Sequence, residues 1–273
     1  MKQSWTSLLC LALGAFAIGT ESYSLAGLLP ALADDFSVSL GVAGQLITAF
    51  ALAYAIGSPV LAVATAGFDR RAVLFGSMAA FGVFNLIAAF SSSYALLFAS
   101  RVGMALAAGT FMPAASAYAV AVSPAAQRGR ALALIYSGLT FATVLGVPLG
   151  LVAGERFGWR SVFSGTAVLA VLALVWMAAQ LRPVPQHATA TLAERLAIAR
   201  RPEVLNALAV TTIALTGAFT VYTYLAPFLA ETVHLTGSAV ALVLFLFGLG
   251  STVGNLAAGS AVDRFGADRV LSV

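Results

Sequence analysis

Charged side chains are scarce in this sequence. They make up 9% of the 273 residues, whereas hydrophobic residues make up 61%. A soluble domain carries about 25% charged residues. Because so few polar groups are present, they cannot cover a water-exposed surface. The scarcity therefore excludes an ordinary soluble domain and predicts that lipid surrounds most of the chain.

Lysine, histidine and cysteine are nearly absent, and each absence excludes a kind of chemistry. Lys2 is the only lysine, so the Gly-x-x-x-x-Gly-Lys loop that binds nucleotide phosphates cannot form. His187 and His234 have no Cys or carboxylate neighbours at metal-ligand spacing. Cys10 is the only cysteine, which excludes an internal disulfide. We therefore expect a protein that is not an enzyme and that holds no metal or cofactor.

Long uncharged stretches divide the chain into segments that can cross a bilayer. A helix of about 20 apolar residues spans the hydrocarbon core, and it satisfies its own backbone hydrogen bonds there. Eight such spans are predicted, at residues 5–30, 41–64, 72–91, 94–120, 131–153, 161–181, 204–229 and 238–261. We therefore expect an all-α protein that crosses the membrane several times.

The positive side chains outside these spans lie almost entirely on one side of the membrane. With a cytoplasmic N-terminus, eleven Lys and Arg residues fall in cytoplasmic segments, and only Arg156 and Arg160 fall on the opposite side. Loops rich in Lys and Arg stay in the cytoplasm. We therefore expect a multi-pass membrane protein with its N-terminus in the cytoplasm. Topology accounts for the net charge of +4, so no nucleic-acid partner is expected.

A repeat relates the start of the chain to its last third. LLPALADDF (28–36) resembles LAPFLAETV (225–233), and Pro30 aligns with Pro227 at an offset of 197, as Phe50 does with Phe247. Parallel repeats of this kind are typical of secondary transporters. We expect a six-helix bundle over 1–181, a cytoplasmic linker with a short amphipathic helix over 182–203, and the first two helices of a second bundle over 204–273. The second copy stops after two helices, which predicts an incomplete protein; a functional eight-helix protein is the alternative.

Two charged residues lie inside predicted spans, Glu21 in the first and Arg101 in the fourth. A charge at mid-membrane is unfavourable by about 2.5–3.5 kcal/mol even on lenient scales, so such residues usually face a cavity or a partner. Counted from the outer ends of their helices, both lie about 12–14 Å deep. We expect them either to pair directly or to face one water-filled cavity, where proton and substrate would compete for Glu21. A purely structural ion pair is the alternative.

Small residues recur every four positions in the fifth span. Such a stripe lets another helix approach closely, and a proline beside it favours a bend. The pattern indicates either tight packing or a rocking interface, with the eighth span as a plausible partner. The residues are Gly138, Ala142, Gly146, Gly150 and Gly154 beside Pro148, and Gly250, Gly254 and Ala258 in the eighth span.

The loop after the eighth span carries charges that could latch one conformation. Its residues are Gly259, Asp263, Arg264, Gly266 and Arg269, and the loop after the second span carries the basic pair Arg70 and Arg71.

The spacing Gly259-x-x-x-Asp263-Arg264-x-Gly266-x-x-Arg269 resembles the cytoplasmic loop signature of the major facilitator superfamily. LLFASRVGMALAAG, which contains Arg101, resembles the fourth-helix motif of that family, and the stripe from Gly138 to Gly150 resembles the fifth-helix motif of its proton-driven antiporters. GTESYSLAGLLPALADDFSVS and ERFGWRSVF are similar to segments of the drug/proton antiporter branch, which includes arabinose-efflux-like and chloramphenicol-resistance permeases. Of the signature in the first loop, only Arg70 and Arg71 remain.

The resemblance implies two six-helix bundles around a central cavity, lined by the first and fourth helices and worked by rocking. It implies proton-coupled efflux of small lipophilic compounds across the bacterial inner membrane, driven by the proton gradient without a cofactor or an obligate protein partner. Tyr23, Phe111, Tyr136 and Tyr222 are candidate cavity walls. The alternatives are a sugar or nucleoside permease of the same fold, which the few amides in the spans disfavour, and a membrane scaffold that does not transport.

Overall fold

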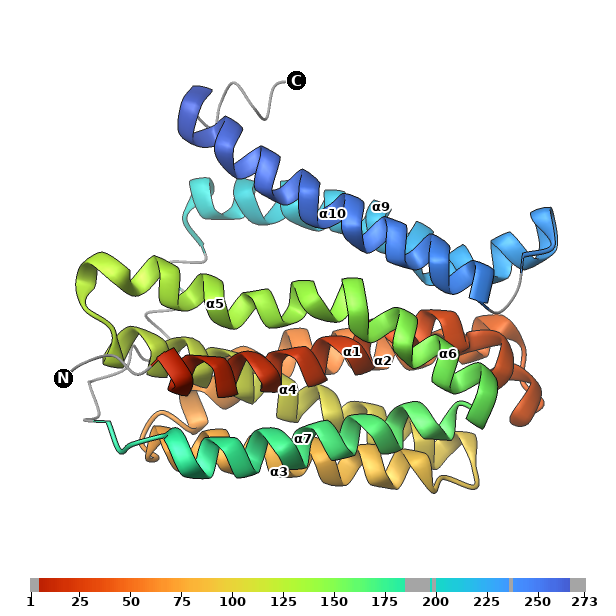
Figure 1. Cartoon of the computed structure of the whole chain (residues 1–273), viewed down its shortest axis with the longest axis horizontal. Helices are drawn as coiled ribbons and strands as arrows, with labels where there is room; N and C mark the ends of the chain where they lie inside the picture. The colour runs from red at the N-terminus through yellow and green to blue at the C-terminus, as the bar shows by residue number, and fades with distance from the viewer. Residues whose placement is uncertain (1–4, 185–196, 198–199, 236–237, 266–273) are drawn as a thin grey trace.

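The computed structural model describes residues 5–184, 197, 200–235 and 238–265, and every element in them is helical (Figure 1). Seven helical segments there are long and apolar enough to cross a membrane, and the last helix contributes a shorter apolar stretch, Ala239–Gly254. The all-α prediction is therefore confirmed. The elements are α1 (Trp5–Asp35), α2 (Leu40–Ala64), α3 (Arg70–Ala89), α4 (Tyr94–Val122), a 3₁₀ turn (Ala125–Gln127), α5 (Arg128–Phe141), a π-helical turn (Ala142–Gly146), α6 (Val147–Phe157), α7 (Arg160–Gln180), α9 (Pro202–Val233) and α10 (Ser238–Phe265).

Short polar side chains begin three of the first four helices. The side-chain oxygens of Ser39, Asp69 and Ser93 each accept a hydrogen bond from the backbone amide three residues later, at 3.2, 2.9 and 3.3 Å. Each cap satisfies an amide that the first helical turn leaves free. Because the loops between α1, α2, α3 and α4 are short, successive helices run in opposite directions across the membrane.

Helix α1 lies at the centre of a six-rod bundle, in which α5, the π turn and α6 count as one rod. It packs against α2, α4, α5, α6, α7 and α9. Leu8, Leu11 and Leu25 of α1 are at most 1% exposed, which is why almost the whole length of this helix is apolar or small. The helix continues through Pro30 to Asp35, beyond the end predicted for the first span.

The glycine stripe of the fifth span packs against α1. A Cβ atom added at Gly138 would meet the backbone carbonyl oxygen of Ala12, and one added at Gly146 would meet the side chain of Thr20. The two helices therefore run parallel in a fixed register, with backbones close enough that only glycine fits. The same register continues along both helices, where a Cβ added at Gly150 would meet Ser24 and one added at Gly154 would meet Leu28.

This packing corrects the expectation that the stripe meets the eighth span. Among the described residues, nothing lies within 4 Å of a Cβ added at Gly250 or Gly254, and the side chain of Ala258 is outside the description. Helix α10 instead approaches the π turn at Gly248, where an added Cβ would lie 2.7 Å from the carbonyl oxygen of Thr143. The repeated small residues predicted close packing but not its partner.

The π turn explains how the fifth span passes Pro148. Proline lacks an amide hydrogen, and its ring clashes with the carbonyl four residues earlier, here that of Val144. The widened turn over Ala142–Gly146 accommodates that carbonyl. The fifth span, predicted over 131–153 with a bend favoured by Pro148, is thus two α-helical pieces joined at a bulge.

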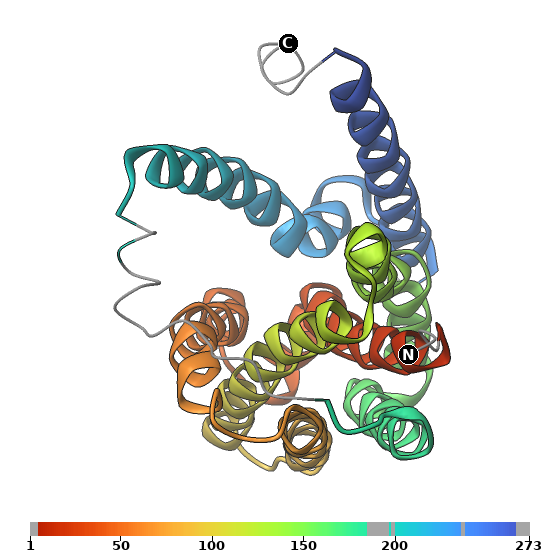
Figure 2. The same cartoon turned by 90° about the vertical axis from the view of Figure 1, so that its left-hand side faces the viewer.

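Helices α9 and α10 lie beside the bundle, where α9 packs against α1 and α10 packs against α6 and the π turn. They approach it near α6 and diverge from it toward the N-terminal end of α1 (Figures 1 and 2). Near the approach, the hydroxyl of Tyr222 donates to the carbonyl oxygen of Tyr23 at 3.1 Å. In the diverging part, Leu208 and Ile213 of α9 are 51% and 75% exposed. The amphipathic helix predicted in the linker falls on residues outside the description, so the linker boundaries remain a prediction.

We predict that Gly138→Ala destabilises the protein. The added methyl group would press on the α1 backbone, and overpacking of this kind lowers the free energy of unfolding by about 1–3 kcal/mol. Thermal melting in detergent measures the change. Gly165→Ala on α7 is the matched control, because nothing lies within 4 Å of its added Cβ. Equal melting of the two variants would contradict the close contact between α1 and α5.

Candidate functional site

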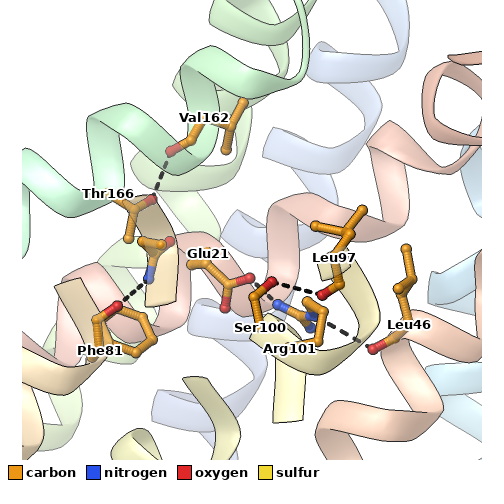
Figure 3. A network of polar contacts seen from close by, with 9 residues as sticks. Glu21, Leu46, Phe81, Leu97, Ser100, Arg101, Val162 and Thr166 are labelled. Atoms are coloured by element: carbon orange, nitrogen blue, oxygen red, sulfur yellow. Dashed lines mark hydrogen bonds and ion pairs between the residues drawn. The ribbon is translucent and has the colours of Figure 1, made fainter. Parts of the chain in front are cut away.

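Glu21 of α1 and Arg101 of α4 form an ion pair inside the six-rod bundle. The Nη1 atom of Arg101 donates to Oε1 of Glu21, and the two side chains are 1% and 0% exposed respectively (Figure 3). Of the two arrangements expected from their depth, the structure shows direct pairing. Their equal depth in the membrane lets two helices that are far apart in sequence bring opposite charges together.

Helix α2 completes the surroundings of Arg101. The Nε atom donates to the carbonyl oxygen of Leu46 at 3.3 Å. The guanidinium carbon lies 4.4 Å from the ring centroid of Phe50, a cation–π contact. Neither residue was predicted for this site. The repeat could have indicated Phe50. Its equivalent at the offset of 197 is Phe247, which lines the aromatic cavity described below.

One oxygen of the Glu21 carboxylate has no hydrogen-bond partner among the described residues. This atom, Oε2, is buried, as is the hydroxyl of the adjacent Ser22, which also lacks a partner. An unpaired acceptor in a dry setting is unfavourable. A proton bound at Oε2 would remove the charge of the carboxylate and weaken its attraction to Arg101. Oε2 is therefore the position on this carboxylate at which a proton would bind.

The ion pair is fully buried in this conformation. Neither Glu21 nor Arg101 lines any of the cavities described here. Leu46 and Phe50 of α2 contact the pair, and this covering corrects the expectation that a water-filled chamber opens onto Glu21. Direct competition between proton and substrate for this carboxylate has no structural basis in this state.

An aromatic cavity of about 290 Å³ lies where α1 and the π turn face α9 and α10. Tyr23 and Tyr222, both predicted as cavity walls, line it together with Phe219 and Phe247. The ring centroids of Tyr222 and Phe247 are 5.3 Å apart, and those of Tyr23 and Phe219 are 6.3 Å apart. Thr143 of the π turn also lines the cavity. Thr143 was not predicted as a cavity residue, because the π turn that places it there was not predicted.

The two other residues expected in a cavity wall lie elsewhere. Phe111 is 0% exposed and packs in the bundle core beside Gly14 of α1. It faces inward because α4 buries this side against α1. Tyr136 of α5 is 48% exposed and lines none of the described cavities. Aromatic type alone did not distinguish a core residue from a wall.

Helix α1 links the ion pair to the aromatic cavity. Glu21 and Tyr23 are two residues apart, which is about 200° around a helix. Their side chains therefore point to opposite sides, Glu21 toward α4 and Tyr23 toward α9 and α10. A rotation or shift of α1 would move both groups together.

The loop residues expected to form a latch are only partly described. Arg70 and Arg71 begin α3, and the Arg71 guanidinium lies 5.4 Å from the ring centroid of Phe75. Gly259, Asp263 and Arg264 lie on the backbone of α10, but their side chains are not described. Gly266 and Arg269 lie outside the described residues. The latch therefore stays a prediction.

A second ion pair, between Asp35 and Arg160, lies at the end of the bundle where α1 ends and α7 begins. Arg160 donates to Oδ2 of Asp35 at 2.9 Å and to the carbonyl oxygen of Ser91 at 3.0 Å, and the indole of Trp159 donates to the same Asp35 oxygen at 3.1 Å. These contacts join α1, the loop before α4, and α7. No group of three His, Cys, Asp or Glu side chains within the described ranges is placed to hold a metal ion.

Comparison with known proteins identifies a family. The sequence model described as Major Facilitator Superfamily matches residues 11–273. The inner membrane transport protein YdhP of Escherichia coli (strain K12) is 37% identical over 257 residues, which cover 94% of this chain and 66% of that protein. The chloramphenicol resistance protein of Streptomyces lividans is 37% identical over 261 residues, covering 94% of this chain and 67% of that protein. The chain thus spans about two thirds of the length of these curated relatives.

Solved structures share the fold. A bacterial homologue of the human lysosomal transporter Spinster, in an inward-facing and occupied conformation, superposes with a TM-score of 0.78 at 20% identity, covering 96% of this chain and 62% of that one. A D-xylose–proton symporter gives a TM-score of 0.69 at 18% identity, covering 97% and 70%.

We predict strong energetic coupling within the buried ion pair. Arg101→Met and Glu21→Gln should each lower the free energy of unfolding by about 3–5 kcal/mol, because each leaves a buried charge without its counter-charge. The double variant should lose much less than the sum. Unfolding of the four proteins in detergent measures the coupling.

The half-exposed pair Asp35–Arg160 serves as the control. Its side chains are 42% and 44% exposed, so the same cycle with Asp35→Asn and Arg160→Met should give a coupling of about 1 kcal/mol or less. Additive losses at Glu21 and Arg101 would show that the two residues do not depend on each other.

Proposed function

The chain belongs to the major facilitator superfamily, and we propose that it is a secondary active transporter that exports small lipophilic compounds in exchange for protons. It is a multi-pass membrane protein. We place it in the bacterial inner membrane with the N-terminus in the cytoplasm, since its relative YdhP is an inner membrane protein and Lys and Arg gather on the N-terminal side.

The observation that carries the proton-coupling proposal is the sealed pair of Glu21 and Arg101. A carboxylate inside a membrane bundle is unfavourable unless it is paired or has a function. Here Oε1 is paired and Oε2 is left without a partner. A purely structural pair would be stabilised by satisfying both oxygens, whereas a proton-binding site needs one free acceptor. We therefore assign Glu21 as the proton carrier and Arg101 as the cation that holds it charged between protonations.

The aromatic cavity supports a lipophilic substrate. Its lining residues are mostly aromatic or aliphatic, with the hydroxyls of Tyr23, Thr143 and Tyr222 as the polar side-chain groups. Of these, Tyr222 donates to the α1 backbone and Thr143 to its own helix, to the carbonyl of Thr140. A sugar would need many more hydrogen-bonding groups than this wall offers. A relative named for chloramphenicol resistance supports the same substrate class.

Coupling between the two sites would pass through α1. Protonation of Glu21 would loosen the contact of α1 with α4, while Tyr23 on the opposite side of the same helix faces the cavity. The glycine register would keep α1 and the α5–α6 rod moving as one unit. In this scheme the proton binds at Glu21 and the substrate binds in the aromatic cavity. The two exclude each other because each favours a different position of α1.

We predict that Glu21→Gln abolishes efflux driven by a pH gradient, because glutamine keeps the size of glutamate but cannot carry a proton. The measurement is drug accumulation and proton flux in inverted membrane vesicles that contain the full chain, because an exporter carries the drug into the lumen of such vesicles. Asp34→Asn, an exposed carboxylate change on the same helix, should leave both fluxes unchanged.

Outcomes of this experiment separate the alternatives. Unimpaired gradient-driven efflux by Glu21→Gln would falsify the role of Glu21. Gradient-driven movement of a sugar or nucleoside instead of lipophilic drugs would favour the permease alternative. Absence of any flux in the unaltered protein would favour a membrane scaffold.

A further inference from the structure

We propose that an anionic phospholipid binds in a groove on the outer side of the six-rod bundle, between α2 and α3. Helix α4 forms the floor of this groove, and Arg70 stands at one end. We call it the α2–α3 groove. The inference is independent of the proposed transport function, because it concerns a different face of the molecule.

Two adjoining cavities form the α2–α3 groove. The larger, of about 450 Å³, is lined by residues such as Leu61 of α2, Gly76 and Phe84 of α3, and Leu106 of α4. The smaller, of about 170 Å³, is lined by Arg70 and by α4 residues such as Pro113. Thr65, Phe68, Val73 and Thr110 line both, so the two cavities are one continuous groove.

The groove opens toward lipid. Thr110 comes nine residues after Arg101, about two and a half helical turns, so it lies on the side of α4 opposite the ion pair. Phe68 and Leu106 in the groove wall are 64% and 36% exposed. The groove therefore faces away from α1 and from the aromatic cavity, on the side of α4 that we expect to face the bilayer.

The length and lining of the groove fit one acyl chain. Along α3 the lining residues run from Ala72 to Phe84, about 18 Å of helix. One leaflet contributes about half of a hydrocarbon core of roughly 30 Å. The larger cavity is lined almost entirely by apolar side chains, and nothing lies within 4 Å of a Cβ added at Gly76. A chain descending from the membrane surface to mid-leaflet can occupy this space.

The charge at the surface end fits an anionic headgroup. The side chain of Arg70 takes part in no hydrogen bond or ion pair within the described part of the chain. The neighbouring Asp69 accepts from the amide of Ala72 at 2.9 Å and so is engaged in capping α3. Arg71 follows on the same turn, over the ring of Phe75. The phosphodiester of a lipid headgroup would therefore bind the guanidinium of Arg70, which no described residue neutralises.

Native mass spectrometry of the purified full chain tests the proposal. The protein is mixed with equal amounts of phosphatidylglycerol and phosphatidylcholine that carry the same acyl chains, and the bound lipids are compared. We expect the protein to retain phosphatidylglycerol preferentially. Arg70→Gln should lower this preference about fivefold, the factor for one basic side chain at an anionic surface. Gly76→Leu should reduce retention of both lipids, because its side chain fills the groove without a clash.

Two matched variants control for general effects. Arg128→Gln removes an exposed positive charge on the same membrane face, and Gly165→Leu adds the same side chain to an exposed glycine of α7 outside the groove. Both should bind lipid as the unaltered protein does. If Gly76→Leu does not fold, Ala80→Leu blocks the groove one turn further along.

Three results would overturn the proposal. The first is equal retention of the two lipids by the unaltered protein. The second is a loss of preference in Arg128→Gln as large as that in Arg70→Gln, since that would reflect net charge alone. The third is retention of soluble glycerol phosphate as strong as that of the lipid, which would indicate a phosphate site without an acyl chain.

Discussion

The ion pair between Glu21 and Arg101 joins α1 to α4 where neither water nor lipid can stabilise a separate charge. In such a setting each partner depends on the other, because a lone buried charge is far less favourable than the pair. The arginine needs further contacts, and α2 supplies them through the carbonyl of Leu46 and the ring of Phe50. Three helices are thereby held in one arrangement by a single guanidinium.

Helix α1 carries three different contacts on three sides. The first is the pair with Arg101; the second is the close register with the glycines of the α5–α6 rod; the third is the aromatic cavity shared with α9 and α10. The second is rigid, because backbone atoms meet directly. The other two involve a titratable group and a space for a ligand. Because α1 is fixed only against the α5–α6 rod, a change at the ion pair can shift the helix and so alter the aromatic cavity on its other side.

The sequence predicted those parts of the fold that depend on composition along the chain. Uncharged stretches predicted the helices, and charges at equal depth brought Glu21 and Arg101 together. It did not predict which helix the glycine stripe would meet, because small residues show that a neighbour is close without identifying it. The π turn was missed, since the effect of Pro148 depends on how Val144 and its neighbours relax. Phe111 was misplaced because an aromatic ring suits a core and a cavity wall equally well.

The separation of the pair in sequence has a consequence for biosynthesis. Arg101 follows Glu21 by 80 residues, so at a translation rate of about 5–20 residues per second the acid leaves the ribosome several seconds before its partner. During that interval we expect α1 to enter the bilayer with its carboxyl group protonated, because a lone charge there is unfavourable. Insertion of α4 then supplies the cation that lets the group ionise inside the bundle. The nascent chain itself would thus pass through the same change of protonation that we assign to the finished protein.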